Sequence, residues 1–263
     1  MLGGIPNEDV WRGMVSGSEA VLSRMRRRHR RIPGSPRCKQ CLLPLGGPLS
    51  WAMRLRGLHA SEGNPNFCNT CQVFVRQHPG GVEVELTFLF ADVRGSTSLA
   101  ESVSPTNFTA VMNRFFAIAN RVLVESDAYV DRLMGDEVIG IYMPYLGAGN
   151  SRRAVHAAKE LLIATGHQNA EGPWLPVGIG VNSGIAFVGS VGTPDGRSEF
   201  TAMGDVVNVT SRFSALAPAG EILISEAAWK DAAIEGEPPK HRRLQVKGKA
   251  EPIDVFVLKV GAG

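Results

Sequence analysis

The stretch FLFADVRGST, residues 88–97, decides the fold. It completes the run Val82–Phe90, which first alternates and then becomes continuously apolar, as is typical of a strand at the centre of a sheet. The carboxylate of Asp92 ends this strand, and the turn Gly95-Ser96-Thr97 favours a helix start directly after it. Backbone N–H groups at a helix N-terminus attract phosphate, and a neighbouring carboxylate can hold Mg²⁺. The alternative is that Asp92 only caps the helix.

Hydrophobic periodicity predicts strands and helices on the C-terminal side of this stretch. Helices are expected at 105–125, 150–167 and 205–217, and strands at 128–134, 137–142, 175–182, 185–191, 221–225, 243–246 and 253–260. The strands 175–182 and 185–191 are expected to form a hairpin around Ser183-Gly184. The order strand–helix–strand–strand–helix–strand predicts an α+β fold, a ferredoxin-like or polymerase-palm sandwich.

Two further segments carry polar side chains suited to chemistry. Asp136 lies in the turn between the strands 128–134 and 137–142. In a palm fold this hairpin lies beside the end of the first strand, so Asp92 and Asp136 could share a pair of metal ions, although turn chemistry alone would also explain Asp136. Asn208 and Arg212 are four residues apart and project from one face of a helix, where the alternative is an ordinary surface pair.

Charge divides the chain of 263 residues unevenly. Residues 1–81 hold 12 Lys and Arg against 4 Asp and Glu, whereas the whole chain has 28 against 25. A helix is predicted over residues 6–31, and it ends in the basic run 24–31. Such a run is either a solvated helix end or a contact for an anionic partner, nucleic acid or a membrane surface, which charge alone does not distinguish.

The four cysteines form two pairs, Cys38-x-x-Cys41 and Cys68-x-x-Cys71. Two such knuckles can complete a tetrahedral four-sulfur site, which leaves no position for water and therefore predicts one structural Zn²⁺. A redox pair is the alternative. We therefore expect a basic helix over residues 1–35, a small zinc-ribbon-like module over 36–80 and a catalytic domain over 81–263.

Composition favours an ordinary globular protein, with 44% hydrophobic and 20% charged residues. No apolar run approaches the ~20 residues needed to span a bilayer. The first residues lack the charged and then apolar pattern of a signal peptide, so a cytoplasmic location is expected.

Together the segments Phe88–Thr97, Arg132–Glu137 and Phe200–Arg212 resemble the class III nucleotidyl cyclases. The resemblance covers Val82–Val260, with the motifs in the family's order. The closing Val246–Lys249 is also similar to the family's, in which a lysine, here Lys247, reaches the triphosphate.

The resemblance implies a role for each motif residue. Asp92 and Asp136 would bind two Mg²⁺ or Mn²⁺, assisted by the Val93 carbonyl. Asn208 would orient the ribose, and Arg212 would stabilise charge that develops on the α-phosphate. In the family the metal ligands come from one subunit and the ribose and phosphate ligands from the other, so this chain would form a homodimer with two equivalent sites.

Base selection in the family uses two positions, which fall on Arg132 and Thr201. Thr201 fits the adenine-selecting subgroup, which implies an adenylate cyclase that converts ATP to cyclic AMP and pyrophosphate. Arg132 departs from the usual lysine, because its planar guanidinium is larger than an ammonium and not interchangeable with it.

Three other interpretations are compatible with parts of the sequence. A catalytically weak or inactive homologue would bind nucleotide or dimerise without turnover, and Arg132 is the feature that favours it. A diguanylate cyclase would explain Met134–Val138, which resembles the GGDEF hairpin, but not the Asn208 and Arg212 helix. A zinc-dependent nucleic-acid-binding protein would use the basic first 80 residues.

Overall fold

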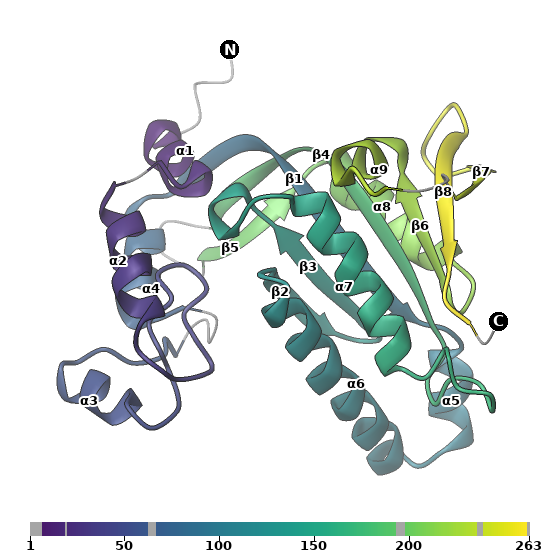
Figure 1. The fold of residues 1–263 in the computed structure, drawn as a ribbon, viewed down its shortest axis with the longest axis horizontal. Helices are drawn as coiled ribbons and strands as arrows, with labels where there is room; N and C mark the ends of the chain where they lie inside the picture. Colours follow the sequence, from purple (N-terminus) through teal and green to yellow (C-terminus); the bar gives the residue numbers. More distant parts are fainter. Residues whose placement is uncertain (1–6, 19, 63–66, 193–197, 236–238, 262–263) are drawn as a thin grey trace. The chain divides into compact units, whose positions relative to one another are not determined.

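The computed structural model describes residues 7–18, 20–62, 67–192, 198–235 and 239–261. The chain divides into two compact units (Figure 1). The first unit comprises residues 1–84 and 187–202, and the second comprises residues 85–186 and 203–263. The domain boundaries expected after residues 35 and 80 stay predictions.

The helices and strands follow the chain in this order. Up to the end of the first strand they are α1 (Glu8–Ser16), α2 (Ala20–Arg30), α3 (Ser50–Leu55), α4 (Asn69–Gln77) and β1 (Gly80–Val93). Next come α5 (Ser96–Ser102), α6 (Pro105–Glu125), β2 (Tyr129–Met134), β3 (Glu137–Tyr142), the 3₁₀ turn η1 (Pro144–Leu146) and α7 (Asn150–Ala164). The remaining elements are β4 (Val177–Gly192), β5 (Ser198–Met203), α8 (Asp205–Leu216), β6 (Glu221–Ser225), α9 (Glu226–Ala232), β7 (Lys240–Leu244) and β8 (Ile253–Lys259).

The described strands form one eight-stranded mixed sheet in the order β2-β3-β1-β4-β6-β8-β7, and β5 pairs with β4. β1 pairs antiparallel with β3, and β4 pairs parallel with β6. The expected strand–helix–strand–strand–helix–strand order is present as β1-α6-β2-β3-α7-β4. The α+β prediction is therefore confirmed.

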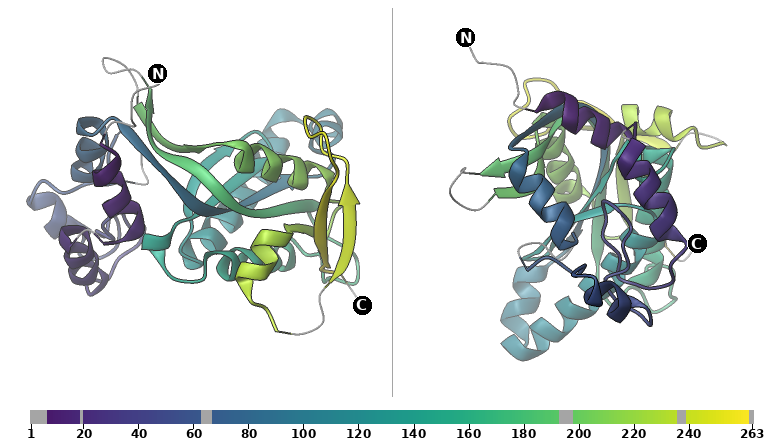
Figure 2. Two further views of the ribbon diagram at one scale, coloured as in Figure 1. Left: turned by 90° about the horizontal axis from the view of Figure 1, so that it is seen from above. Right: turned by 90° about the vertical axis from the view of Figure 1, so that its left-hand side faces the viewer.

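Both faces of the sheet in the second unit are covered by helices, as the left view of Figure 2 shows for α8 and α9. β6 is buried throughout, and its side chains alternate between the two faces. Ile222 and Ile224 belong to the core that contains α6, α7 and α9, whereas Leu223 packs with α8. This burial on both sides explains why β6 reads as a continuously apolar run.

The expected hairpin around Ser183-Gly184 is wrong, because β4 is one continuous strand through these residues. The Ser183 hydroxyl is buried and lies 2.8 Å from the hydroxyls of both Thr87 and Ser151. A turn there would take Ser183 out of this buried network, in which the hydroxyls of Thr87 and Ser151 also lie 3.0 Å apart, and a buried hydroxyl without a partner is costly. Instead β4 pairs with β5, which lies further along the chain.

The single helix expected over residues 6–31 is also wrong. Gly17, at φ 75°, ends α1 and donates its N–H to the carbonyl of Met14. Glycine adopts this left-handed conformation at low cost and commonly ends helices for that reason. A second helix, α2, begins at Ala20.

Helix α6 begins and ends where the periodicity predicted. Ser104 caps it by accepting the N–H of Asn107 at 3.3 Å, and Pro105 occupies its first position, where the missing N–H costs nothing. With 21 residues α6 is the longest of the described helices, yet none of these is both long and apolar enough to cross a membrane.

A buried ion pair joins the last strands of the second unit. Glu221, at the start of β6, accepts hydrogen bonds from Nη1 and Nη2 of Arg242 at 2.6 and 3.1 Å. Its other partner is Lys259, whose Nζ lies 3.0 Å away. Burial alone would raise the pKa of Glu221, but the bonds from Arg242 and Lys259 lower it overall.

This lowered pKa gives the stability of the fold a defined pH dependence. Glu221 contributes stability above its unfolded pKa, and the contribution is lost as pH falls through the lower folded pKa. Glu221→Gln is expected to lower the free energy of unfolding at pH 7 by about 1–3 kcal/mol and to flatten its decline below pH ~4.5. Urea unfolding between pH 3 and 7 measures both effects.

Glu226→Gln is the matched control, because Glu226 is exposed and pairs with the exposed Lys230 on the same helix. It should change the stability little at any pH. Equal pH profiles for Glu221→Gln and the parent chain would refute the assignment.

Candidate active site

Asp92 lies at the carboxyl end of the central strand. The segment Thr87–Asp92 of β1 pairs residue by residue with β3, and Asp92 faces Glu137 in this register. All residues from Leu86 to Ala91 are buried, whereas the side chain of Asp92 keeps 22% of its surface exposed. The strand therefore presents this carboxylate at the edge of the core. The helix that follows is capped by Gly95, so Asp92 is not its cap.

Asp136 is held beside this strand end by the turn between β2 and β3. Gly135 has φ 69°, a conformation that favours glycine, and it opens this tight turn. The Val93 N–H donates to the backbone carbonyl of Asp136 at 3.1 Å. The Ser96 hydroxyl donates to the Asp136 carboxylate. The structure thus brings together Asp92, Val93, Ser96 and Asp136, and their role as cation and substrate ligands stays a prediction.

Negative charge is concentrated at this place. Burial raises the pKa of Asp92; Arg94 opposes this shift, and the nearby charge of Asp136 adds to it. Burial also raises the pKa of Glu137 to about 7, with further contributions from Asp92 and Asp136. A hydrogen bond from Ser214 to Glu137, at 3.2 Å, partly offsets these effects. The charges of Asp92 and Asp136 thus lie near each other, and positive charge placed there would relieve their repulsion.

Arg94 and Glu137 lie beside Asp92 and were not predicted as neighbours from the sequence. Arg94 forms an ion pair with Asp92, donates from Nη1 to the carbonyl of Ala215 at 2.6 Å, and donates its backbone N–H to Pro176 at 2.9 Å. A signal was present, because side chains two residues apart at the end of a strand lie on one face. Its charge opposite to Asp92 made the pairing predictable.

The turn after β1 holds the three residues predicted to bind phosphate, Gly95, Ser96 and Thr97, and this role stays a prediction. Gly95 is left-handed, at φ 72°, and is the N-cap of the short helix α5. Because glycine has no side chain, Gly95 offers no side-chain oxygen to accept hydrogen bonds from the first backbone N–H groups of α5. These N–H groups include that of Thr97. Gly95, Ser96 and Thr97 therefore lie next to the paired aspartates through the Ser96 bond.

Helix α8 carries Asn208 and Arg212 on its exposed side, while Val209 and Phe213 are buried. The helix packs closely on β4 at Gly180, where an added Cβ would lie 2.6 Å from the backbone N of Ser214. This contact fixes the helix against the sheet. Within the described part of the chain, no hydrogen bond or ion pair joins Asn208 or Arg212 to Asp92 or Asp136.

The other predicted substrate ligands lie on separate elements. Thr201 is partly exposed in β5. Arg132 lies in β2, and its side chain is outside the described residues. Lys247 is exposed in the segment between β7 and β8. Its neighbour Lys249 bonds to Asp205, the first residue of α8, at 2.6 Å.

The four cysteines converge in the first unit. Cys38, Cys41, Cys68 and Cys71 are buried and unbonded as disulfides, and their sulfurs lie within 4.8 Å of one another. The spacing of the pairs therefore predicted a real cluster. Binding of zinc by this cluster stays a prediction.

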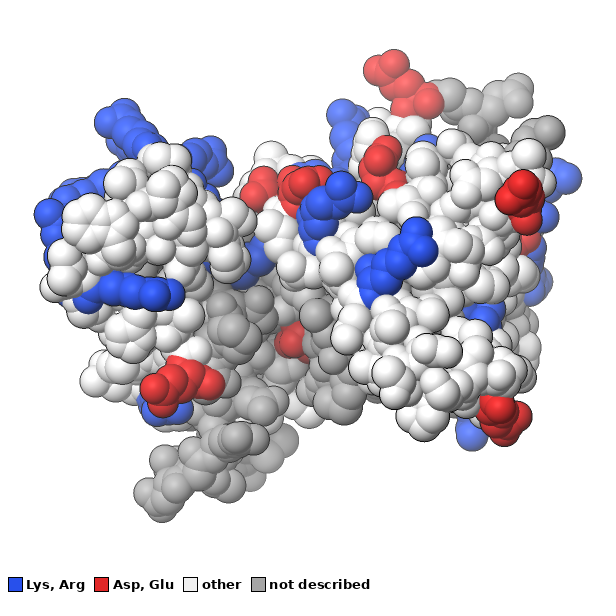
Figure 3. All heavy atoms as spheres, turned by 90° about the horizontal axis from the view of Figure 1, so that it is seen from below, with Lys and Arg blue, Asp and Glu red and all other residues white. Residues whose placement is uncertain are grey.

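Some arginines of the basic N-terminal segment make hydrogen bonds within the first unit. Lys and Arg predominate over Asp and Glu on the left-hand part of Figure 3, which holds this segment. Arg26 donates to the carbonyls of Lys39 and Gln40 at 3.2 and 2.7 Å. Arg37 donates to the carbonyls of His29 and Leu42, each at 3.0 Å. The anionic partner for the remaining arginines stays a prediction.

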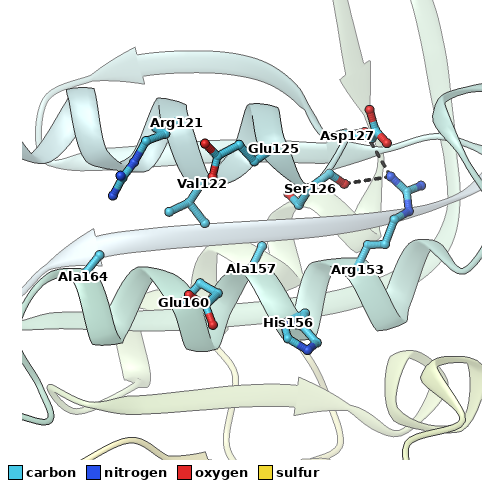
Figure 4. A pocket seen from close by; sticks show the side chains of 10 residues that line it. All are labelled: Arg121, Val122, Glu125, Ser126, Asp127, Arg153, His156, Ala157, Glu160 and Ala164. Carbon is cyan, nitrogen blue, oxygen red and sulfur yellow. Dashed lines mark hydrogen bonds between the residues drawn. The ribbon is translucent and has the colours of Figure 1, made fainter.

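A groove of about 470 Å³ lies between α6 and α7 (Figure 4). Arg153 reaches across it from α7 and donates to the carbonyls of Ser126 and Asp127 at 2.9 and 3.1 Å. These carbonyls follow the end of α6, where helical partners are lacking. Arg153 thus joins the two helices, and we assign the groove to their packing.

Comparison with known proteins identifies the family. Residues 82–259 match the family described as the adenylate and guanylate cyclase catalytic domain. An adenylate cyclase of Anabaena cylindrica is 29% identical over 188 residues, which are 66% of this chain and 36% of that protein. The chain thus spans about a third of the length of this relative.

Solved structures of cyclases have the same fold. The guanylyl cyclase Cya2 is 27% identical, with a TM-score of 0.61 over 70% of this chain and 95% of that one. The adenylyl cyclase CyaB from P. aeruginosa is 25% identical, with a TM-score of 0.60 over 68% of this chain and 95% of that one. These matches favour a nucleotidyl cyclase over a diguanylate cyclase. Since the family match covers most of the chain and the fold agrees, this chain belongs to the adenylate and guanylate cyclase catalytic domain family.

Proposed function

We propose that this chain is an adenylate cyclase, which converts ATP to 3′,5′-cyclic AMP and pyrophosphate in a homodimer. One observation carries the proposal: a single chain holds the adjacent carboxylates Asp92 and Asp136 and, on the exposed side of α8, the unpaired side chains Asn208 and Arg212 among the described residues. The first pair suits cations, and the second suits a ribose and a phosphate.

The residues around Asp92 fit divalent cations. Its raised pKa has burial and the charge of Asp136 among its causes, so positive charge placed there would relieve both. Asp92 and Asp136, with the Val93 carbonyl, offer only oxygen ligands, which Mg²⁺ and Mn²⁺ prefer. Two such ions, when bound, would acidify the attacking hydroxyl and neutralise the leaving phosphate.

The reaction needs no nucleophile from the protein. The 3′-oxygen of the substrate forms a bond to the α-phosphorus, its proton leaves to solvent, and the bond from the α-phosphorus to the bridging oxygen breaks to release pyrophosphate. The protein's part is to hold these groups in line and to stabilise charge. In our proposal Asn208 orients the ribose, Arg212 stabilises the α-phosphate, and Lys247 with Gly95–Thr97 binds the other phosphates.

The shared site requires two copies of the chain. Because Asn208 and Arg212 have no bond to the aspartates of their own chain in the described part, a second copy related by a two-fold axis would bring them opposite Asp92 and Asp136. Two equivalent sites then form at one interface.

Thr201 supports ATP as the substrate. Its hydroxyl can accept a hydrogen bond from the exocyclic amine of adenine, and Arg132 can donate to a ring nitrogen. Solved cyclases of both specificities resemble this chain, so the base is the part of the proposal that most needs a test.

The purified chain should be given ATP or GTP separately with Mg²⁺ or Mn²⁺, and the products identified by mass spectrometry. We expect cyclic AMP, with kcat/KM for ATP at least tenfold above that for GTP. Formation of cyclic GMP from GTP at a higher rate would make the chain a guanylate cyclase. Nucleotide binding without either product would show an inactive homologue.

A further inference from the structure

The sulfur atoms of the four cysteines match the geometry of one tetrahedral metal ion. A zinc–sulfur bond of about 2.3 Å places ligand sulfurs roughly 3.8 Å apart at the corners of a tetrahedron. The sulfurs of Cys41 and Cys68, one from each pair, lie 3.7 Å apart. Because all four lie within 4.8 Å of one another, they form one site rather than two separate redox pairs.

The backbone shapes each pair into a knuckle. In the first pair, the Cys38 N–H donates to the Leu43 carbonyl at 2.8 Å, and the Leu42 N–H donates to the Cys38 carbonyl at 2.9 Å. In the second pair, Cys68 is the N-cap of α4, and the Gln72 N–H donates to its carbonyl at 3.0 Å. The ligands are thus preformed on two chain segments that little regular structure connects, and a shared ion would tie them together.

The second knuckle is joined directly to β5. Phe67 precedes Cys68, is 1% exposed, and packs its ring edge-on against Phe200 with centroids 5.5 Å apart. Trp11 of α1 stacks on Phe200 with centroids 5.9 Å apart. The Trp11 indole N–H donates to the His78 carbonyl, just after α4, at 3.0 Å. Phe200 is therefore held between α1 and the residue that adjoins a metal ligand.

Thr201 is the next residue of β5. Adjacent side chains of a strand point to opposite faces. Phe200 is 4% exposed and packed in the first unit, while Thr201 is partly exposed on the other face. Fixing the Phe200 ring thus fixes the face of β5 from which the Thr201 side chain projects.

We propose that one Zn²⁺ bound by Cys38, Cys41, Cys68 and Cys71 orders β5 through Phe67 and Phe200, and so positions Thr201 toward the nucleotide base. The part concerning the base rests on the proposed function; the part concerning zinc and β5 does not. Phe67 and Phe200 are positioning residues in this scheme, because they act through Thr201.

The first experiment measures metal and backbone order, without substrate. The full chain is expected to contain one zinc per chain, and Co²⁺ substituted for it should show the absorption of a tetrahedral four-thiolate site. Removing zinc with a chelator should speed amide exchange in residues 198–203 at least tenfold. A chain that contains no zinc, that holds iron instead, or whose β5 exchanges at the same rate after zinc loss would overturn the proposal.

Phe67→Leu separates metal binding from the coupling. It should keep one zinc yet reproduce the faster exchange in β5 and a severalfold rise in KM for ATP, with kcat changed much less. Phe116→Leu is the control, because its ring lies against Phe115 of α6, in the second unit. If β5 exchanges as slowly in Phe67→Leu as in Phe116→Leu, the coupling is refuted. If neither ATP nor GTP is turned over, the proposed function fails, while the zinc content and exchange rates still decide the inference.

Discussion

A chain in which Asn replaces Asp92 is expected to lose at least about 1,000-fold in kcat for ATP, and Asp136→Asn to lose as much. Each change removes one of two adjacent oxygen ligands and leaves a neutral amide in its place. Asp136→Asn relieves a repulsion with Asp92, whereas Asp92→Asn also removes the ion partner of Arg94, so the stability of each variant must be measured beside its rate. Rates with Mg²⁺ or Mn²⁺, together with thermal unfolding, measure the two effects.

Asp254→Asn is a suitable control for this loss. Asp254 is an exposed carboxylate of β8 whose ion partner is Arg243. The kcat of Asp254→Asn for ATP should stay within about twofold of that of the parent chain. Near-normal turnover by either Asp92→Asn or Asp136→Asn would remove the basis of the cation site.

Mixing two inactive variants is expected to restore activity. Asp92→Asn lacks a cation ligand, and Arg212→Ala lacks the phosphate ligand, so each homodimer has two defective sites. A mixed dimer has one site with both defects and one with none. Random exchange of equal amounts would therefore restore about one quarter of the parent activity. Coexpression with two different affinity tags isolates the mixed dimer for measurement.

The matched control combines Asp92→Asn with Asp136→Asn. Both defects lie in the same set of residues, so every site in their mixed dimer lacks one cation ligand and no activity should return. If the first mixture also stays inactive while forming dimers, Arg212 does not act across an interface, and the shared-site proposal is wrong.

Local signals predicted much of the second unit. Ser104 and Pro105 mark the start of helix α6 in the sequence. Strands β3 and β6 begin and end at the residues that their apolar patterns predicted. The predicted hairpin at Ser183-Gly184 failed for a long-range reason. The hydroxyls that hold Ser183 in a strand belong to Thr87 and Ser151, which lie 96 and 32 residues away. Turn propensity cannot contain that information.

For the candidate site, the sequence predicted which residues lie close together, and their roles stay predictions. The sequence identified Asp92 and Asp136, and the structure places them together. Arg94 and Glu137 were not predicted, because a motif contains only the residues shared with a family and leaves out their charged neighbours. The contact between Phe67 and Phe200 joins segments 133 residues apart in the numbering and could not be derived from either segment alone.

The ion pair between Arg94 and Asp92 gives the molecule a counterion of its own. Arg94 is tied at the same time to Ala215 near the end of α8 and to Pro176 before β4. Arg94 therefore neutralises part of the negative charge of Asp92 within the same chain. In the proposed site, a cation that binds to Asp92 must compete with the Arg94 guanidinium. The affinity of the site for that cation therefore depends partly on the strength of the Arg94 ion pair.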